Sequence, residues 1–300
     1  MSGTLAAPVA AEGFWARNAR SYARSPLAIA AAALLLLLLL LALFAPWIAP
    51  QDPYDLTRLS VMNSKMPPMS RGSDGLLYLL GSDQQGREML SVMLYGLRVS
   101  LFVSITSVAI GLAIGAVLGL VAGFGGGWAD AAIMRVVDVQ LGIPAILLAI
   151  IILALLGQGV DKTIIALILT QYAYFTRTVR SAVLVERQRD YVLAAQGLAL
   201  PRHRVLLRHV LPNCLAPVIV VATLHIGGAI ALEATLSFLG LGVPVTEPSL
   251  GMVIANGFQY LLSGRYWISL FPGTLLMVLV IAINLVGDRL RDVLNPRLAH

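Results

Sequence analysis

Charged side chains are scarce in this sequence, and their scarcity decides the class of protein. Of 300 residues only 12% are charged, whereas 58% are hydrophobic, and the mean hydropathy is +0.85. A soluble globular domain usually carries about 25% charged residues. The composition therefore excludes an ordinary soluble domain and predicts an all-α protein that crosses a membrane several times.

Cysteine and lysine are also scarce, and each shortage removes a class of chemistry. The single cysteine, Cys214, cannot form an internal disulfide, and no Cys/His pattern has metal-ligand spacing. The two lysines, Lys65 and Lys162, follow Ser64 and Asp161, so neither ends a Gly-Lys-Ser/Thr phosphate loop. Hydrolase and kinase patterns are absent too. We therefore predict no catalytic residue, no metal site and no cofactor bound by this chain.

The net charge of +6 does not indicate nucleic acid as a partner. The arginines occur in short stretches between apolar segments, which is how membrane topology is encoded. We therefore expect membrane lipid, and no nucleic acid, among the partners.

Long uncharged runs mark the membrane segments. A hydrocarbon core about 30 Å thick needs about 20 apolar residues of helix. Five runs are long enough: 25–51, 99–129, 139–160, 209–232 and 266–287. A sixth run, 163–176, is short, but the long side chains of Lys162 and Arg177 at its ends can reach the membrane surface. The prediction is a bundle of six transmembrane helices.

Two uncharged stretches need a separate interpretation. The first run follows three arginines as a signal peptide would, but 27–48 is longer than the hydrophobic part of a signal peptide, so we predict an uncleaved anchor. The stretch 248–264 is interrupted by Pro248, Gly251, Gly257 and Gly264. We predict that it is an interfacial or re-entrant segment and not a seventh span.

The distribution of basic residues predicts the orientation. With six spans, fourteen Lys and Arg residues lie on the side of the termini and seven on the opposite side. The side richer in Lys and Arg is cytoplasmic. The expected organisation is a cytoplasmic segment 1–26, a first helix 27–49, an external loop 50–98, a five-helix core 99–287 with a cytoplasmic loop at about 181–212, and a cytoplasmic tail 288–300.

Few ionisable residues lie inside the predicted spans, which argues against coupling to protons or sodium ions. Glu233 is the one acid well within an apolar run, and we expect a structural carboxylate near the outer face, hydrogen-bonded to a neighbour. Asp138 follows Arg135 by three residues, a spacing that favours a local ion pair on a helix.

A glycine appears every fourth residue in the second run, at Gly111, Gly115, Gly119 and Gly123. This spacing places the glycines on one stripe of a helix, where another backbone can approach closely. The partner helix can belong to this chain or to a second subunit.

A basic segment, 186–213, stands out among the cytoplasmic loops. Its residue pattern predicts a short helix at 191–200, which ends before Pro201. A second basic helical stretch is expected to follow and to lead to Pro212. A plain positively charged loop without further function is the alternative.

This segment resembles the permeases of bacterial ABC importers, in particular the dipeptide, oligopeptide and nickel group. Those permeases carry Tyr-Val-Glu-Ala-Ala-x-x-x-Gly and, after a spacer, Arg-His-Ile-Leu-Pro-Asn. The corresponding residues here are Tyr191, Val192, Leu193, Ala194, Ala195 and Ala199, then Arg208, His209, Val210, Leu211, Pro212 and Asn213. Leu193 stands where the family usually has Glu, and Ala199 where it usually has Gly. We expect the first change to alter docking strength and the second to favour helix.

The resemblance continues along most of the chain. The segment 80–101, with Asp83, Gly86 and Arg87, is similar to the external segment before the second helix of these permeases. The stretches 233–242, 248–251 and 270–297 are similar to their C-terminal third. Four similar pieces in the right order make the resemblance specific.

The resemblance implies the fold and partners of a type I ABC importer permease in the bacterial inner membrane. It implies a homologous second permease, one or two kinds of ATPase subunit that use ATP and Mg²⁺, and an external substrate-binding protein. The residues Tyr191, Val192, Leu193, Ala194, Ala195, Gln196, Leu198 and Ala199 would form a coupling helix, with Val192, Ala194, Ala195 and Leu198 packed against the ATPase.

The resemblance leaves the substrate open. Dipeptides or short peptides are the expected solutes, with nickel or another peptide-like solute as the alternative. A transporter that acts alone and a membrane-embedded enzyme remain as rival classes, and no residue indicates a substrate site. The external loop either receives the binding protein, shapes the entrance of the pathway or caps the bundle.

Overall fold

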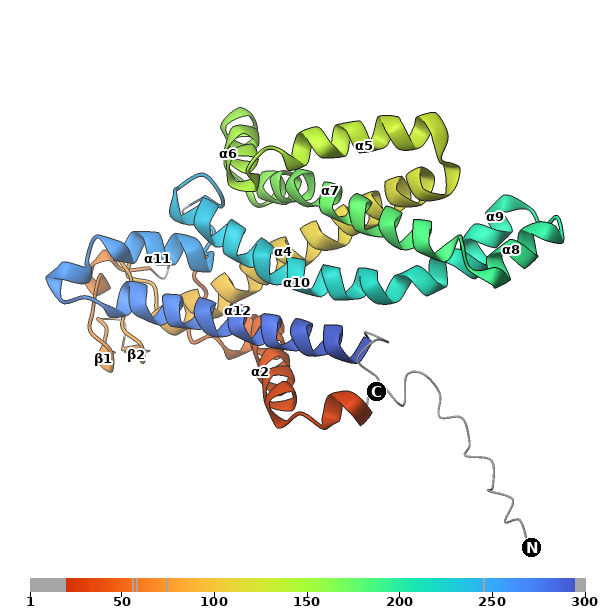
Figure 1. Ribbon diagram of the computed structural model, residues 1–300. Helices are drawn as coiled ribbons and strands as arrows, with labels where there is room; N and C mark the ends of the chain where they lie inside the picture. The colour runs from red at the N-terminus through yellow and green to blue at the C-terminus, as the bar shows by residue number, and fades with distance from the viewer. Residues whose placement is uncertain (1–19, 56, 58, 74, 245, 295–300) are drawn as a thin grey trace, which may run out of the picture.

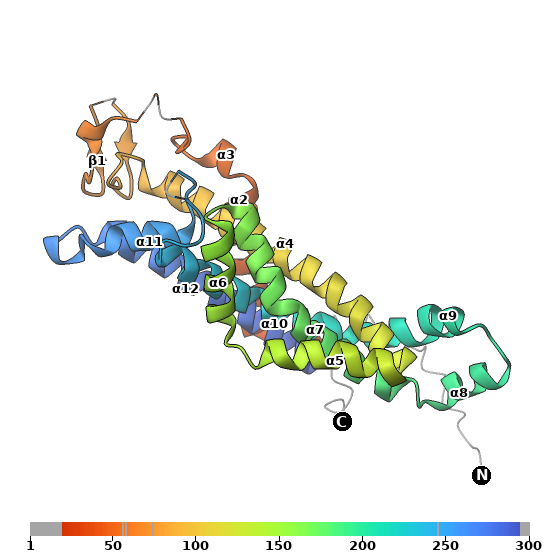
Figure 2. The ribbon, with the colours of Figure 1, turned by 90° about the horizontal axis from the view of Figure 1, so that it is seen from above.

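The computed structural model describes residues 20–294 except 56, 58, 74 and 245. The ends of the predicted cytoplasmic segment and tail, and the basic residues Arg17, Arg58 and Arg297, lie outside the described residues. The described part is an elongated bundle of helices (Figure 1). One end of the long axis carries a small hairpin and helix α11, and the opposite end carries helices α8 and α9 (Figure 2).

Four helical segments among the described residues are long and apolar enough to cross a membrane. They are α2 (Pro26–Leu43), α4 (Met89–Leu120) with its π-helical continuation η2 (Val121–Gly125), α10 (Leu211–Phe238) and α12 (Trp267–Leu294). The pair α5 (Gly127–Leu141) and α6 (Ala145–Leu156) forms a fifth, bent segment. Helix α7 (Val160–Glu186) has 27 residues, long enough to span, but its composition is more polar. Four of the six predicted spans are thus long apolar helices, the third is the bent pair, and α7 lies at the position of the predicted fourth.

The third predicted span differs from the structure. The run 139–160 contains no continuous helix, because α5 and α6 meet at an angle of 91°. Gly142 ends α5, and Pro144 precedes the first residue of α6. Proline lacks the N–H that a continuing helix needs and disfavours helical geometry at the residue before it. The uncharged run 139–160 therefore contains a break between two helices, which its lack of charge did not indicate.

The second span also differs, because α4 begins at Met89 and not at residue 99. Its residues 89–98, nearly three turns, lie in the predicted external loop. The Glu88 carboxylate caps this helix by accepting hydrogen bonds from the backbone N–H groups of Leu90 (3.1 Å) and Ser91 (2.6 Å). A side chain that accepts from these otherwise unpaired donors stabilises a helix start.

The stretch 248–264 forms helix α11 (Leu250–Phe258) and the short turn η4 (Leu261–Ser263). Nine residues of helix extend about 13 Å, too short to cross a bilayer. This agrees with the prediction of a non-spanning segment. Its N-terminal half packs between α10 and α4, since a Cβ at Gly251 would lie 2.3 Å from the Ala234 carbonyl oxygen.

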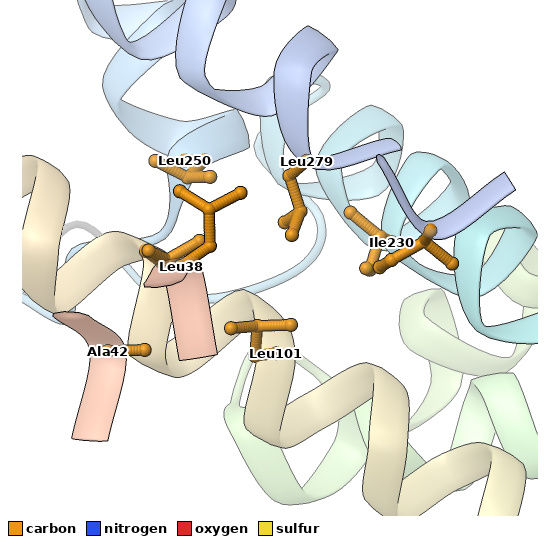
Figure 3. Packing of buried hydrophobic residues seen from close by; sticks show 8 residues of the cluster. Leu38, Ala42, Leu101, Ile230, Leu250 and Leu279 are labelled. Atoms are coloured by element: carbon orange, nitrogen blue, oxygen red, sulfur yellow. The ribbon is translucent and has the colours of Figure 1, made fainter. Parts of the chain in front are cut away.

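One apolar cluster joins most of the bundle. Leu38 and Ala42 of α2 meet Leu101 of α4, Ile230 of α10 and Leu279 of α12 (Figure 3). Burial of such side chains holds helices together by close packing, since lipid is itself apolar. The first helix is therefore packed into the core.

Helix α5 is attached to α7 by two ion pairs. Arg180 donates to both oxygens of Asp130, at 2.5 and 2.7 Å, and Arg177 donates to Asp138 at 2.5 Å. The predicted pairing of Asp138 with Arg135 is therefore wrong. Asp138 pairs with Arg177, which is distant in sequence, because α7 lies directly beside α5 in the folded chain.

Short elements lie at both ends of the bundle. One end carries α3 (Ala45–Ile48), η1 (Val61–Asn63) and a hairpin of β1 (Ser70–Arg71) and β2 (Leu77–Tyr78), with Ser70 opposite Tyr78. The other end carries α8 (Asp190–Gly197), α9 (Arg202–Val205) and the π-helical turn η3 (Leu206–Val210), which leads into α10.

Candidate functional site

Helix α8 is the candidate docking element. It lies beyond the ends of α7 and α10, at the end of the molecule opposite the hairpin (Figure 2). It begins at Asp190, whose carboxylate favours the first turn of a helix, and it ends at Gly197. The predicted helix at 191–200 is therefore shorter at its C-terminal end.

The end of α8 gives Ala199 an unexpected role. The N–H of Leu200 donates to the Ala195 carbonyl (3.2 Å), and the N–H of Ala199 donates to the Gln196 carbonyl (2.9 Å). This is the hydrogen-bond pattern of a Schellman cap, whose penultimate residue is left-handed and usually glycine. Ala199 has φ +52°. The expectation that alanine at this position favours helix is therefore wrong, because the residue lies just past the helix.

The two faces of α8 have different surroundings. Val192 and Ala195 are buried against the chain itself, in a cluster with Val183 of α7 and Val210 of η3. Val192 and Ala195 were expected to pack against the ATPase, but they are packed inside this chain and are not part of the exposed face. The side chains left on the surface of α8 are those of Asp190, Tyr191, Leu193, Ala194 and Gln196, and Leu198 is exposed just past the end of the helix. Leu198 is 77% exposed.

Tyr191 connects the two parts of the motif. Its hydroxyl donates to the Glu186 carboxylate at the end of α7 and to the carbonyl of His209 (3.3 Å). The side-chain amide of Asn213 donates to the Tyr191 hydroxyl (2.9 Å) and to the same His209 carbonyl (2.7 Å). Burial and the Glu186 carboxylate raise the pKa of Tyr191 to about 12, so its hydroxyl stays protonated. Sequence spacing alone could not have revealed this junction.

The remaining residues of the second motif form the entry to α10. Arg208 is exposed in η3, Leu211 is half-buried, and Pro212 lies in the first turn of α10, where a missing N–H costs little. The motif therefore starts a spanning helix directly beside α8.

The glycine stripe faces α7 of the same chain. A Cβ at Gly115 would lie 2.5 Å from the Phe175 Cβ, and one at Gly119 would lie 2.7 Å from the Thr176 carbonyl oxygen. Gly123 approaches Val183 in the same way, whereas Gly111 has ordinary spacing, with its nearest atom at 3.8 Å. The stripe thus brings the backbones of α4 and α7 together.

Asp83, Gly86 and Arg87, which were predicted to lie in an external segment, form a buried turn. Arg87 Nε donates to Asp83 Oδ2 at 2.7 Å, with both side chains almost fully buried. Gly86 has φ +78°, and a Cβ there would lie 2.3 Å from the Ser60 carbonyl oxygen. A side chain at this position would break the turn.

The external segment is attached to the last helix as well. Trp267 of α12 donates its indole N–H to the Ser82 carbonyl (3.2 Å), and the Lys65 ammonium lies 4.3 Å from the ring centroid of Tyr260. These contacts place the segment over the ends of α4 and α12. The segment is thus fixed to the C-terminal part of the chain.

Glu233 is fully buried and has hydrogen-bond partners. Its carboxylate accepts from Ser100 of α4 and from Ser237 of α10, each at 2.8 Å. The bonds connect two spanning helices, as the interpretation of a structural acid requires. In the part of the chain described, no group of three His, Cys, Asp or Glu side chains could hold a metal ion.

The sequence of this chain matches known families of membrane transport proteins. The family model for the binding-protein-dependent transport system inner membrane component matches residues 115–300, and that for the N-terminal TM domain of oligopeptide transport permease C matches residues 13–68. The chain is similar to the di/tripeptide transport system permease protein DppC of Pseudomonas aeruginosa, with 39% identity over 99% of this chain and 95% of that protein. It is 40% identical to the Escherichia coli K12 dipeptide transport system permease protein DppC, over 86% and 84% of the two chains.

The solved structures support the same fold. A structure of the MetNI methionine ABC transporter in an inward-facing conformation is similar with a TM-score of 0.56 and 22% identity, over 68% of this chain and 97% of that chain. The all-α fold is thus that of a type I importer permease. The chain belongs to the family of inner membrane components of binding-protein-dependent transport systems.

Proposed function

We propose that this chain forms half of the translocation pathway of an ATP-driven importer of dipeptides or short peptides. The observation that carries the proposal is the 39% identity to a di/tripeptide permease along nearly the whole length of both chains. The absence of a phosphate-binding loop from the sequence means that hydrolysis of ATP with Mg²⁺ falls to partner ATPase subunits. A homologous second permease and an external binding protein complete the transporter.

The exposed face of α8 is the contact for the ATPase. Leu193, Ala194 and Leu198 present apolar surface to the cytoplasm, where an apolar patch indicates a protein partner. Because α8 packs on α7 and α10 through its other face, movement of the ATPase would move both spanning helices. The bundle would then alternate between two conformations. ATP binding to the ATPase favours one of them, release after hydrolysis favours the other, and the alternation moves the solute across the membrane.

Reconstitution tests the proposed function. The chain is purified with its partner subunits, placed in liposomes and supplied with the binding protein, ATP and labelled di- and tripeptides. Peptide uptake that requires ATP and all subunits is expected. Uptake of nickel instead would assign a different solute to the same architecture, and uptake by this chain alone without ATP would refute the proposal.

A pair of variants tests the docking face. Ala194→Asp places a charge on the exposed face and should abolish co-purification of the ATPase, whereas Ala194→Ser keeps a small neutral side chain and should retain it. Ala195 is unsuitable for this test, because it is buried inside the chain. Normal ATPase binding and uptake with Ala194→Asp would exclude this face as the contact.

A further inference from the structure

A stripe of polar residues runs along one face of α7. Thr163, Thr170, Tyr174, Arg177 and Ser181 recur at intervals of three or four residues once the apolar Leu167 is counted. Side chains at this spacing lie on one side of a helix. The hydroxyls of Thr163, Thr170 and Ser181 donate to carbonyls within their own turn of helix. A charged side chain such as that of Arg177 faces water or protein and avoids lipid. The end of the stripe around Arg177 therefore faces protein or water.

The half of the stripe near the cytoplasmic end is open. Tyr174, Arg177 and Ser181 line a groove of about 580 Å³ between α7 and α10. Asn213 and Pro217 form its α10 side. Arg177 is held at the edge by Asp138, but its side chain remains 51% exposed. The groove thus offers polar groups to a solute at the end of the bundle where α8 lies.

The outer half of the same stripe is closed. Thr163 and Thr170 are buried, and Leu167 packs in a cluster with Leu236 of α10 and Leu153 of α6. The boundary lies near Tyr174, whose ring contacts His225 of α10 at a centroid distance of 5.3 Å. The polar face therefore continues outward beneath α10 and is covered there.

Gln171 marks this boundary with an unusual feature. Its side chain lies about one turn outward from Tyr174, it is only 6% exposed, and neither its amide oxygen nor its amide nitrogen has a hydrogen-bond partner. Buried amides are nearly always paired, so an unpaired one needs an explanation. A polar ligand that reaches this level when α10 moves would supply both partners.

We propose that the polar face of α7 lines the solute path, that the groove is its inner part, and that the backbone of a short peptide is the ligand. This inference rests on the proposed function. An amide such as Gln171 has one acceptor and two donors, which match the N–H and C=O of a peptide group. The groove is lined by a cation, Arg177, and an anion, Glu186. Arg177 is paired with Asp138, and Glu186 accepts from Tyr191, so the termini of a zwitterionic peptide would share these charges with their present partners.

The apolar members of the groove, Ala182, Val185 and Pro217, accept side chains of different kinds without specific contacts.

Cysteine labelling tests the assignment in the complete transporter. The one native cysteine is replaced in Cys214→Ser, and Ser181→Cys is compared with Leu169→Cys, an exposed apolar position on another face of α7. A membrane-impermeant thiol reagent is applied from the cytoplasmic side of inside-out vesicles. Ser181→Cys should react at least about tenfold faster, because reaction requires access from water. Trialanine should slow only the Ser181→Cys reaction.

The outcomes separate the inference from the proposed function. Slow labelling at both positions would mean that the second permease or lipid covers the groove, and labelling unaffected by trialanine would remove the peptide as ligand; either result overturns the inference. ATP-driven uptake by the unchanged chain is measured alongside. If that uptake is absent, the proposed function fails, whatever the labelling shows.

A second variant tests Gln171 directly. Gln171→Met keeps the length of the side chain and removes both unpaired polar atoms. The expected result is a higher thermal unfolding temperature together with peptide uptake at least about tenfold lower, while ATP hydrolysis continues. Unchanged uptake would exclude Gln171 from the path, and lower stability would show that its amide is already satisfied.

Discussion

At the scale of single residues, Ala199 has an unfavourable backbone conformation at the end of the candidate docking helix. It adopts a left-handed backbone at the end of α8. This conformation costs a residue with a Cβ roughly 1 kcal/mol that glycine avoids. Ala199→Gly should therefore stabilise α8 by about 1 kcal/mol, seen as slower amide hydrogen exchange of residues 192–197.

The matched change at Ala194 should have the opposite sign. Ala194 lies inside α8 and is exposed, so Ala194→Gly removes helix propensity and should cost about 1 kcal/mol. If both glycine variants exchanged faster than the unchanged chain, the cap assigned to Ala199 would be incorrect.

Tyr191 supports a second prediction at this scale. Tyr191→Phe keeps the ring and removes a hydroxyl that contacts Glu186, His209 and Asn213. We expect α8 to be held less firmly, by about 1 kcal/mol, and more ATP to be hydrolysed for each peptide taken up. The measurement is the ratio of ATP hydrolysis to uptake in proteoliposomes.

A double-mutant cycle provides the control for Tyr191. Asn213→Ala removes the amide that donates to the same hydroxyl, so the combined variant should be less impaired than the sum of the single effects. Additive effects would show that the two side chains act separately and that the junction does not transmit movement.

At the scale of elements, the contact of α4 with α7 holds the centre of the bundle. A Cβ at Gly115 would lie 2.5 Å from the Phe175 Cβ and 2.7 Å from the Tyr172 carbonyl oxygen. Gly115→Ala should therefore push the helices apart and lower the stability of the purified complex by about 1–3 kcal/mol, measured by thermal unfolding.

Gly111 offers a control on the same stripe. The nearest atom to a Cβ at Gly111 is 3.8 Å away, so Gly111→Ala should fit and slightly favour the helix. Equal destabilisation by the two alanines would mean that the stripe contacts something other than α7 in the assembled transporter.

At the scale of the whole molecule, orientation in the membrane follows from charge. The side with more arginines should be cytoplasmic, which puts both termini there and the segment around Met62 outside. Met62 is 87% exposed. With Cys214→Ser as the background, Met62→Cys should therefore react with an impermeant thiol reagent from outside the cytoplasmic membrane, while a C-terminal tag should be cut only from inside.

Reversed accessibility would overturn this orientation. It would also place α8 outside the cytoplasm, where no ATP-using partner could reach it, so the labelling pattern bears on the docking proposal as well. Labelling of Met62→Cys from both sides would indicate leaky vesicles, which the protease treatment of the tag detects independently.

The sequence by itself determined the class of protein and the regions in which its long apolar helices lie, but not the start of the second span or the break in the third. Hydropathy is a local property, and a bilayer of known thickness requires runs of known length. Backbone groups in lipid must also be paired within each segment, so each run becomes a helix. The short motif at 191–213 was visible for a related reason, because its residues are close in the chain.

Only the tertiary structure decided which groups meet. The break between α5 and α6 was marked by Gly142 and Pro144, but the uncharged run around them outweighed that signal. The partner of Asp138, the buried face of α8 and the closed side of α7 depend on helices distant in sequence. Packing between spans depends on close contact of side chains and not on polarity, and such contacts leave little trace in a local pattern.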